Sequence, residues 1–201
     1  MSPRSRASNT ERDWEESYRG TPPWDIGRPQ PRFAALELAG RVIDVGCGTG
    51  EHTLMAAAQG ADAFGIDISA TAIAKAREKA RERGVDARFE VLDAFDLPSL
   101  GETFDVALDM GVYHVFDDEA TRARFAGVVH DALKPGGTLH LMCFSDRTPG
   151  DWGPNRIRED ELRRTFAGGW ELVTLEPAEL EINPGLPLAV VQAWYLQARR
   201  R

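Results

Sequence analysis

Apolar and polar positions follow two alternating patterns from residue 41 to the end of the chain. Short apolar runs at 41–46, 61–68, 87–93, 104–111 and 137–145 are each about the length of a strand, and a turn is expected at 134–137 before the last of them. Stretches with helical periodicity lie at 50–59, 70–84 and 118–133. Strands that alternate with helices in this way are typical of a parallel sheet.

The last part of the chain follows a different pattern. A helix is expected at 159–166, followed by strand-like runs at 170–182 and 188–200. Turn residues join these two runs without a helix, so the strands are expected to be antiparallel. The turn residues are Asn183, Pro184, Gly185 and Pro187. We therefore predict an α/β, Rossmann-like fold, with a mostly parallel seven-stranded sheet, a C-terminal antiparallel hairpin and helices on both faces.

The N-terminal region differs from this pattern. Residues 1–12 are polar and rich in Arg and Ser, and we expect them to be disordered. Trp14, Tyr18 and Trp24 are then interleaved with Pro and Gly, which predicts a short helix followed by an ordered loop. Because 201 residues are too few for two ordinary α/β domains, one domain is expected over 13–201. It would comprise an N-terminal lid segment at 13–39 and a Rossmann-like core at 40–201.

Composition and charge narrow the classes of partner. A net charge of −8 disfavours a nucleic acid, because phosphate binding depends on clustered Lys and Arg. No apolar run reaches the roughly 18 residues that span a bilayer, and no export signal is visible, so we expect a cytoplasmic protein without a membrane partner. It would be a monomer or a homodimer. Cys47 and Cys143 are expected to be buried small hydrophobes, and the histidines have no metal-ligand spacing, so no metal is expected.

The most informative motif is the glycine-rich stretch 44–50, DVGCGTG, between the first strand and the first helix. Glycines there allow a tight turn and bring backbone N–H groups close to a ligand. Asp67 ends the second strand about 20 residues later, where a carboxylate can accept both hydroxyls of an adenosine ribose. NAD and S-adenosylmethionine both fit this geometry. Glu51 stands at the last glycine position of G-x-G-x-x-G, which favours the ligand without a pyrophosphate.

Five motifs in this order and spacing resemble the class I S-adenosylmethionine-dependent methyltransferases over residues 40–200. They are DVGCGTG, GIDIS, VLDAFDLP, FDVALDMGVYHVF and LKPGGTLHL. The upstream pattern W-x3-Y-x5-W, followed by Asp25 and Gly27, resembles the thiopurine and halide/thiol methyltransferase group, which acts on small molecules. Tyr18 stands where that group usually has a second Trp, so the identity of the substrate does not follow from the resemblance.

The resemblance implies S-adenosylmethionine as the cofactor and a set of residues that bind it. Gly46 and Gly48 would pass under its methionine part, Asp67 would hold the ribose, and Asp93 with Ala94 would meet the adenine edge, although nearby Asp96 is an alternative to Asp93. The other implied cofactor-binding residues are Asp44, Asp109 and Met110 around the amino end, Ile68, and the lid residues Trp14, Tyr18 and Trp24.

The candidate catalytic residues follow the fourth strand, where ligands gather in open α/β folds. His114 is the first candidate for a proton acceptor, and its alternative is a loop residue with a local hydrogen bond. Tyr113 either lines the pocket or packs in the core. Arg28 either contacts an anionic substrate or faces solvent.

The leading hypothesis is in-line transfer of a methyl group to S, N or O of a small molecule, namely a thiol, a heterocycle or a phenolic compound. An NAD-dependent oxidoreductase and a non-catalytic S-adenosylmethionine-binding module are the alternatives. A nucleic-acid base methyltransferase is disfavoured, because the chain has DMGVY at 109–113 in place of the motif [DN]-P-P-[YF].

Overall fold

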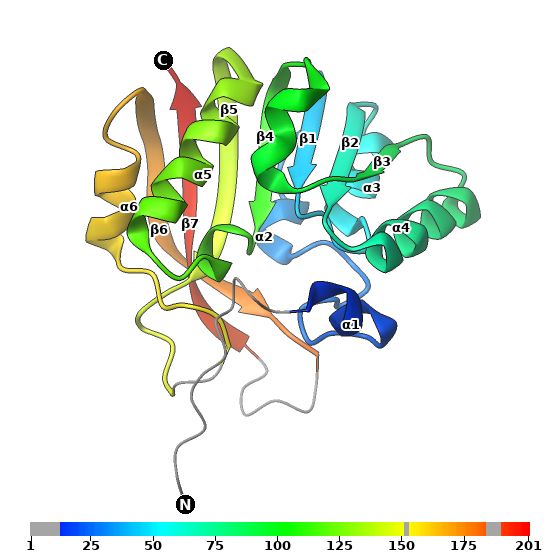
Figure 1. Ribbon diagram of the computed structural model, residues 1–201, viewed down its shortest axis with the longest axis horizontal. Helices are drawn as coiled ribbons and strands as arrows, with labels where there is room; N and C mark the ends of the chain where they lie inside the picture. Colours follow the sequence, from blue (N-terminus) through cyan, green and yellow to red (C-terminus); the bar gives the residue numbers. More distant parts are fainter. Residues whose placement is uncertain (1–12, 151–152, 184–189) are drawn as a thin grey trace, which may run out of the picture.

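The computed structural model describes residues 13–150, 153–183 and 190–201. The expectation for residues 1–12, and most of the turn expected at 183–187, lie outside these ranges. The described part forms a seven-stranded sheet with the order β3-β2-β1-β4-β5-β7-β6 (Figure 1). This arrangement confirms the predicted Rossmann-like fold.

Five parallel strands make up most of the sheet. They are β1 (Arg41–Val45), β2 (Asp62–Asp67), β3 (Arg88–Val91), β4 (Phe104–Met110) and β5 (Leu133–Phe144). β1 lies in the middle and pairs with β2 on one side and β4 on the other. The strand order reverses between β1 and β4, and ligands bind at the carboxyl ends of the strands at such a point. The glycine turn leaves β1 at this position.

The sheet ends in the antiparallel hairpin that the sequence predicts. β7 (Val190–Arg200) pairs with β5 and with β6 (Trp170–Glu181), antiparallel in both cases. One expectation is wrong in detail. Residues 134–137 were expected to form a turn, but they belong to β5, whose pairing with β4 shifts register between Phe104 and Val106. The irregularity accommodates the glycines within a paired strand.

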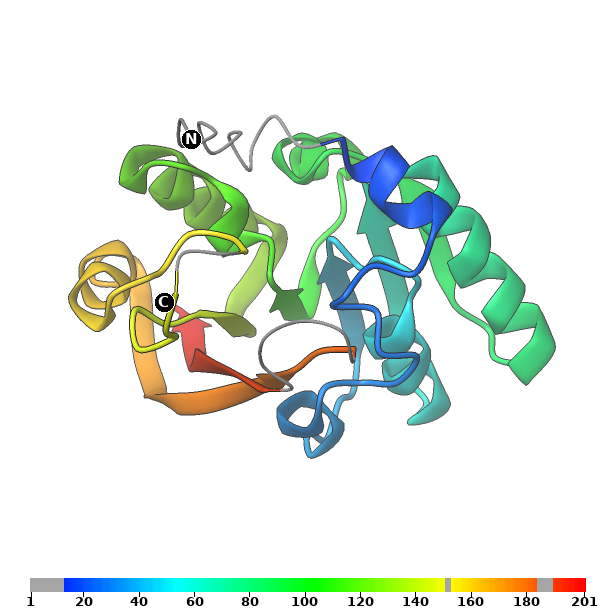
Figure 2. The same cartoon turned by 90° about the horizontal axis from the view of Figure 1, so that it is seen from below.

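Helices cover both faces of the sheet (Figures 1 and 2). On one face α2 (Pro31–Ala34) and α3 (Glu51–Ala58) pack on Val42 and Ala63, and on the other α5 (Glu119–Ala132) and α6 (Glu159–Thr165) pack on Ile43 and Leu141. α4 (Ala70–Arg83) packs against α3 and β3. Val42 and Ile43 are adjacent in β1 and pack into hydrophobic cores on opposite faces of the sheet, as expected for a strand buried on both faces.

The remaining elements are a helix near the carboxyl ends of the parallel strands and two short 3₁₀ helices. α1 (Trp14–Arg19) lies below this edge of the sheet in Figure 1. Two short 3₁₀ helices, η1 (Ala94–Leu100) and η2 (Tyr113–Val115), follow β3 and β4. Within the described residues, no helix combines the length and apolar character needed to cross a membrane.

Candidate active site

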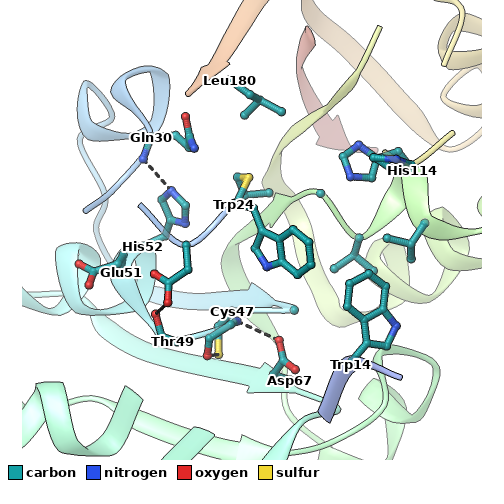
Figure 3. A pocket seen from close by; sticks show the side chains of 18 of the residues that line it. Trp14, Trp24, Gln30, Cys47, Thr49, Glu51, His52, Asp67, His114 and Leu180 are labelled. Atoms are coloured by element: carbon teal, nitrogen blue, oxygen red, sulfur yellow. Dashed lines mark hydrogen bonds between the residues drawn. The ribbon is translucent and has the colours of Figure 1, made fainter. Parts of the chain in front are cut away.

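A cavity of about 670 Å³ opens where β1, β2 and β4 end, beneath the N-terminal segment (Figure 3). Its volume lies within the usual range for small-molecule sites. Many of the residues that the sequence singled out line it: Trp14, Tyr18, Trp24, Gly46, Gly48, Asp67, Ile68, Asp93, Ala94, Met110 and His114. The fold thus gathers most of the predicted site residues in one place.

The glycine turn is closely packed on both sides. A Cβ atom on Gly46 would lie 2.1 Å from Val112 Cγ2, and one on Gly48 would lie 2.7 Å from the Tyr18 hydroxyl. Gly46 and Gly48 also have positive φ angles of 67° and 54°, which strain any L side chain. The sequence therefore needs glycine at both positions, and the backbone of the turn lines the cavity directly.

Asp67 is held in a fixed orientation at the end of β2. One carboxylate oxygen accepts the Gly48 N–H at 2.9 Å and the other accepts the Ser69 N–H at 2.9 Å. Burial raises the pKa of the Asp67 carboxyl above its ordinary value, although the two backbone hydrogen bonds oppose this change. Each carboxylate oxygen can accept more than one hydrogen bond, so Asp67 can also accept the two hydroxyls of a ribose.

The next part of the cavity is formed by the residues after β2 and β3. Asp93 accepts the Phe95 N–H at 2.8 Å and lines the cavity together with Ala94, whereas Asp96 is exposed and lies outside it. The Ile68 side chain is 54% exposed although it is apolar, and it too lines the cavity. An apolar surface beside a carboxylate suits a flat, polar-edged ring such as adenine.

Glu51 occupies the start of α3, where a dinucleotide would place its pyrophosphate. Its carboxylate pairs with Lys79 at 2.7 Å and Arg83 at 2.8 Å. Burial raises the pKa of Glu51, but hydrogen bonds from Arg83 and Lys79 outweigh this effect and lower it below its usual range. A carboxylate in this charged state disfavours a phosphate at the same position.

Two of the three residues expected around the amino end of the cofactor do not line the cavity. Asp44 and Asp109 are 1% and 0% exposed and are not among the residues that line the cavity. Asp44 accepts the Thr53 hydroxyl hydrogen at 2.7 Å, and Asp109 accepts the N–H groups of Val112 and Tyr113. These carboxylates hold α3 and the loop after β4 in place, and of the three residues expected there only Met110 reaches the cavity.

The three aromatic residues of the N-terminal segment contact one another over the glycine turn. The Trp14 and Trp24 rings meet edge to face at 5.7 Å, and Trp24 Nε1 donates to the Tyr18 hydroxyl at 3.1 Å. Tyr18 is 4% exposed and lies against Gly48. A Tyr at this position therefore provides a hydroxyl that accepts the indole N–H, a contact that a second Trp would not make.

His114 lines the cavity, but its hydrogen bonding does not suit a proton acceptor. Its Nδ1 accepts the Phe144 N–H at 2.8 Å, so the lone pair of that nitrogen is already used. Burial lowers the pKa of His114 to about 3, with Arg156 as the second cause. A neutral imidazole in this state carries its proton on Nε2 and is a weak base. The hydrogen bond to Nδ1 and the lowered pKa therefore disfavour the expected role of His114 as a proton acceptor.

Tyr113 does not take part in the cavity. Its side chain is fully buried in the core beside Phe166, and its hydroxyl lies 3.0 Å from the Thr165 hydroxyl and 3.3 Å from Glu161. Glu161 in turn pairs with the buried Arg122. The second of the two alternatives for Tyr113, packing in the core, is the one observed.

Residues that sequence reasoning missed also line the cavity. Gln30 and Leu180 lie on the side away from Asp67 (Figure 3), and Ile26, His52, Phe144 and Glu181 are further lining residues. His52 follows the glycine turn directly, so its position in the sequence was a usable signal. Leu180 and Glu181 reach the site only through the pairing of β6, which no local pattern reveals. Arg28 also lines the cavity, where it pairs with Glu181 instead of remaining free for an anionic substrate.

Several known proteins with similar sequences are methyltransferases. Residues 42–137 match a family described as a methyltransferase domain. A 2-heptyl-1-hydroxyquinolin-4(1H)-one methyltransferase from Mycobacteroides abscessus is 31% identical over 185 residues, covering 85% of this chain and 81% of that protein. A probable thiol methyltransferase 2 from Arabidopsis thaliana is 27% identical over 199 residues, covering 95% of this chain and 88% of that protein.

Solved structures with a similar fold include two that cover most of this chain. A chain from a study described as "Conversion of a Disulfide Bond into a Thioacetal Group during Echinomycin Biosynthesis" is 36% identical, with a TM-score of 0.81 over 92% of this chain and 91% of that chain. An S-adenosylmethionine-dependent methyltransferase from Methanosarcina mazei is 23% identical, with a TM-score of 0.70 over 86% of this chain and 98% of that chain. The second likeness concerns the fold alone.

Proposed function

Because this chain belongs to the class I S-adenosylmethionine-dependent methyltransferases, we propose that it methylates a hydroxyl or thiol group on a largely apolar, aromatic small molecule. The family relationship establishes an enzyme that uses S-adenosylmethionine to methylate a small molecule. The narrower acceptor class rests on the cavity itself.

The residues around the glycine turn fit S-adenosylmethionine. Asp67 would hold the ribose hydroxyls, Asp93 the adenine edge, and the backbone at Gly46 and Gly48 the methionine part. When bound, the cofactor supplies a methyl group on a positively charged sulfur. Trp14 and Trp24 would close the site above it and exclude water, which lets the chain align the two reacting groups.

The observation that supports the acceptor class is the apolar character of the far end of the cavity. Leu180 lies at this end (Figure 3), and Ile26 and Phe144 add apolar side chains to the lining of the same cavity. The charge of Arg28 is balanced by Glu181, and the Gln30 amide exchanges two hydrogen bonds with the Glu181 backbone. Arg28 and Gln30 are therefore satisfied within the chain and are not free to pair with a carboxylate on an acceptor, so an apolar ring would cost less to bind beside them than a carboxylated one.

The relatives support the same class. The Mycobacteroides abscessus protein is named for a hydroxyquinolinone and the Arabidopsis thaliana protein for a thiol. Hydroxylated heterocycles and thiols share an acidic hydrogen on the accepting atom and a small, uncharged body. An acceptor of this kind can lose its proton near neutral pH, which removes the need for a strong base in the cavity.

A methyl-transfer assay with labelled S-adenosylmethionine tests this proposal. The panel pairs 4-nitrophenol, 4-nitrothiophenol and a hydroxyquinoline with carboxylated derivatives of each. We expect turnover of the compounds without a carboxylate. The kcat/KM of each carboxylated derivative should be at least about tenfold lower than that of its parent compound, because a carboxylate without a partner is costly in an apolar site. Preference for the carboxylated compounds, or no turnover on either set, contradicts the proposal.

Leu180→Asp gives a more local test, because Leu180 is 3% exposed at the acceptor end. We expect this variant to lower kcat/KM for the uncharged acceptors at least about tenfold while leaving the affinity for S-adenosylhomocysteine unchanged. Val173→Asp is the matched control, since Val173 lies on the same strand and is 44% exposed. Equal effects of the two substitutions would show that Leu180 does not border the acceptor.

A further inference from the structure

Two histidines line the cavity on different sides, and each accepts a hydrogen bond from the backbone (Figure 3). His52 on α3 accepts the Gln30 N–H through Nε2 at 3.0 Å, and His114 on η2 accepts the Phe144 N–H through Nδ1 at 2.8 Å. A backbone N–H can only donate, so the accepting nitrogen of each ring carries a lone pair. The single proton of each neutral ring must then lie on the other nitrogen.

Both rings stay neutral over the range in which enzymes work. Burial lowers the pKa of His52 to about 4, with Glu51 opposing the change, and it lowers the pKa of His114 to about 3. The proton-bearing atoms are therefore His52 Nδ1 and His114 Nε2. Among the described residues neither atom has a hydrogen-bond partner, and neither is sealed from solvent, because the buried unpartnered atoms are Arg32 Nε and Arg200 Nε.

The other polar groups at this end of the cavity are already used. Arg28 pairs with Glu181, and the Gln30 amide binds the Glu181 backbone. Two N–H donors thus remain beside apolar side chains. Charged groups around the cavity or acting on these rings are Asp25, Arg28, Glu51 with its partners Lys79 and Arg83, Asp67, Asp93, Arg156 and Glu181.

We propose that His114 and His52 are hydrogen-bond donors that bind the methyl acceptor as its anion, with His114 on the reacting atom and His52 on a second polar atom of the same molecule. This inference rests on the proposed function and names its substrate more closely. His114 is assigned to the reacting atom because Nε2 lies 3.1 Å from where a Cβ on Gly111 would be, and the next residue, Val112, packs on Gly46. The substrate class is an acidic phenol or aromatic thiol whose ring carries a second hydrogen-bond acceptor.

The chemistry balances without a protein base. The O–H or S–H bond of the acceptor breaks before transfer, and its proton goes to water. The remaining lone pair on the acceptor forms the new bond to the methyl carbon, while the electron pair of the broken carbon–sulfur bond stays on sulfur. His114 keeps its proton throughout and lowers the energy of the anion by donating to it.

The test measures the pKa of a coloured acceptor in a complex that cannot react. Wild-type enzyme is saturated with S-adenosylhomocysteine, and bound 4-nitrophenol or 4-nitrothiophenol is titrated by the absorbance of its anion. We use whichever compound the methyl-transfer assay shows to be a substrate. The bound compound should have a pKa at least about one unit below its value in water, the scale of one hydrogen bond to a charged group.

The variant His114→Asn separates hydrogen-bond donation by Nε2 from the structural contact of Nδ1 with the Phe144 N–H. Asn can still accept the Phe144 N–H where Nδ1 lies, but it has no group that reaches the position of Nε2. We expect the pKa decrease to disappear and kcat to fall, with S-adenosylhomocysteine affinity within about twofold of wild type. His140→Asn is the matched control, because His140 is 8% exposed, binds the Tyr195 hydroxyl and lies outside the cavity.

His52→Gln tests the second donor in the same way. Gln can accept the Gln30 N–H in place of Nε2 but has no group at the Nδ1 position. KM for the acceptor should rise several-fold while kcat changes little, because this contact is remote from the reacting atom.

The outcomes distinguish this inference from the proposed function. If no phenol or thiol is methylated, the proposed function fails and the inference fails with it. If methylation occurs but the bound pKa is unchanged or raised in wild type, or is still lowered in His114→Asn, only the inference is overturned. The pH dependence of kcat/KM gives a further check. If its inflection stays at the same pH for acceptors of different pKa, a protein base is indicated and the inference is overturned.

Discussion

Asp44 and Asp109 are buried carboxyl groups that hold the elements around the cavity in place without lining it. Both are close to fully buried, and burial raises the pKa of each carboxyl to about 7. Hydrogen bonds from Thr53 to Asp44, and from Val112 and Tyr113 to Asp109, only partly offset this cost. Their energetic effect should therefore be visible in stability as well as in binding.

Asp44→Asn tests this effect through its dependence on pH. A carboxyl with a pKa near 7 in the folded state and near 4 when unfolded stabilises the fold fully below pH 4 and loses that contribution as the pH rises through 7. The difference in free energy of unfolding, wild type minus variant, should fall between pH 4.5 and 7.5 by up to about 1.4 kcal/mol per pH unit. Urea denaturation without cofactor measures it.

Wild type must be compared with Asp44→Asn because the buried histidines change the free energy of unfolding with pH in the opposite direction to Asp44. His52 and His114 have lowered pKa values and add stability as the pH rises toward 6.5. Their contribution is common to both proteins and cancels in the difference. A difference that stays constant across the range would mean that Asp44 is ionised at low pH like an exposed aspartate.

At the residue scale, the sequence predicted many of the residues that line the cavity. It did not predict their hydrogen-bond partners or protonation states. Gly46, Gly48, Asp67 and Met110 line the cavity as expected. The state of His114 depends on an N–H group 30 positions away, at Phe144, which no local motif encodes. The same holds for Asp44 and Asp109, whose partners are set by the packing of the turns around them.

At the scale of elements, the attachment of α1 to α4 determines how the N-terminal segment covers the cavity. Glu15 on α1 accepts hydrogen bonds from the Ser69 hydroxyl at 2.7 Å, from the Thr71 backbone and from the Thr71 hydroxyl. Lys75 on α4 donates to the carbonyl groups of Tyr18 and Gly20. These contacts join α1 to the start of α4, and they explain how a short helix keeps one position.

Glu15→Gln should loosen this attachment. The neutral amide is a weaker acceptor for the Ser69 and Thr71 groups, so α1 should leave the cavity more often and S-adenosylhomocysteine should bind several-fold more weakly, mainly through a faster off-rate. Surface plasmon resonance measures both rates. Glu16→Gln is the control, because Glu16 points to solvent and pairs with Arg19. If both substitutions leave the off-rate unchanged, the segment at 13–39 does not act as a lid.

The elements themselves were largely predictable, because their signals are local. α4 follows the periodicity of 70–84 and begins at Ser69, whose hydroxyl caps the Ala72 N–H. The turn expected at 134–137 rested on Pro and Gly, which signal a turn locally. These residues belong to β5, but the register with β4 passes from Leu133 to Thr138 without pairing any of them, so the local signal marks an irregularity inside the strand.

At the scale of the whole molecule, the acceptor end of the cavity is built from segments far apart in the sequence. Arg28 and Gln30 meet Glu181 across more than 150 positions, and the hairpin of β6 and β7 brings them together. The adenosyl end comes instead from successive strand ends of one parallel sheet. This difference explains why the cofactor could be predicted from motifs and the acceptor class could be proposed only from the structure.

The central claim is that the glycine turn and Asp67 bind an adenosyl group without a phosphate. Calorimetric titration of wild type, Asp67→Ala and the control Asp96→Ala with S-adenosylhomocysteine and NADH tests it most directly. We predict that wild type and Asp96→Ala bind S-adenosylhomocysteine and not NADH, and that Asp67→Ala loses at least about 100-fold in affinity, as expected for two hydrogen bonds to a charged acceptor. Binding of NADH by wild type, or unchanged S-adenosylhomocysteine affinity in Asp67→Ala, would contradict it.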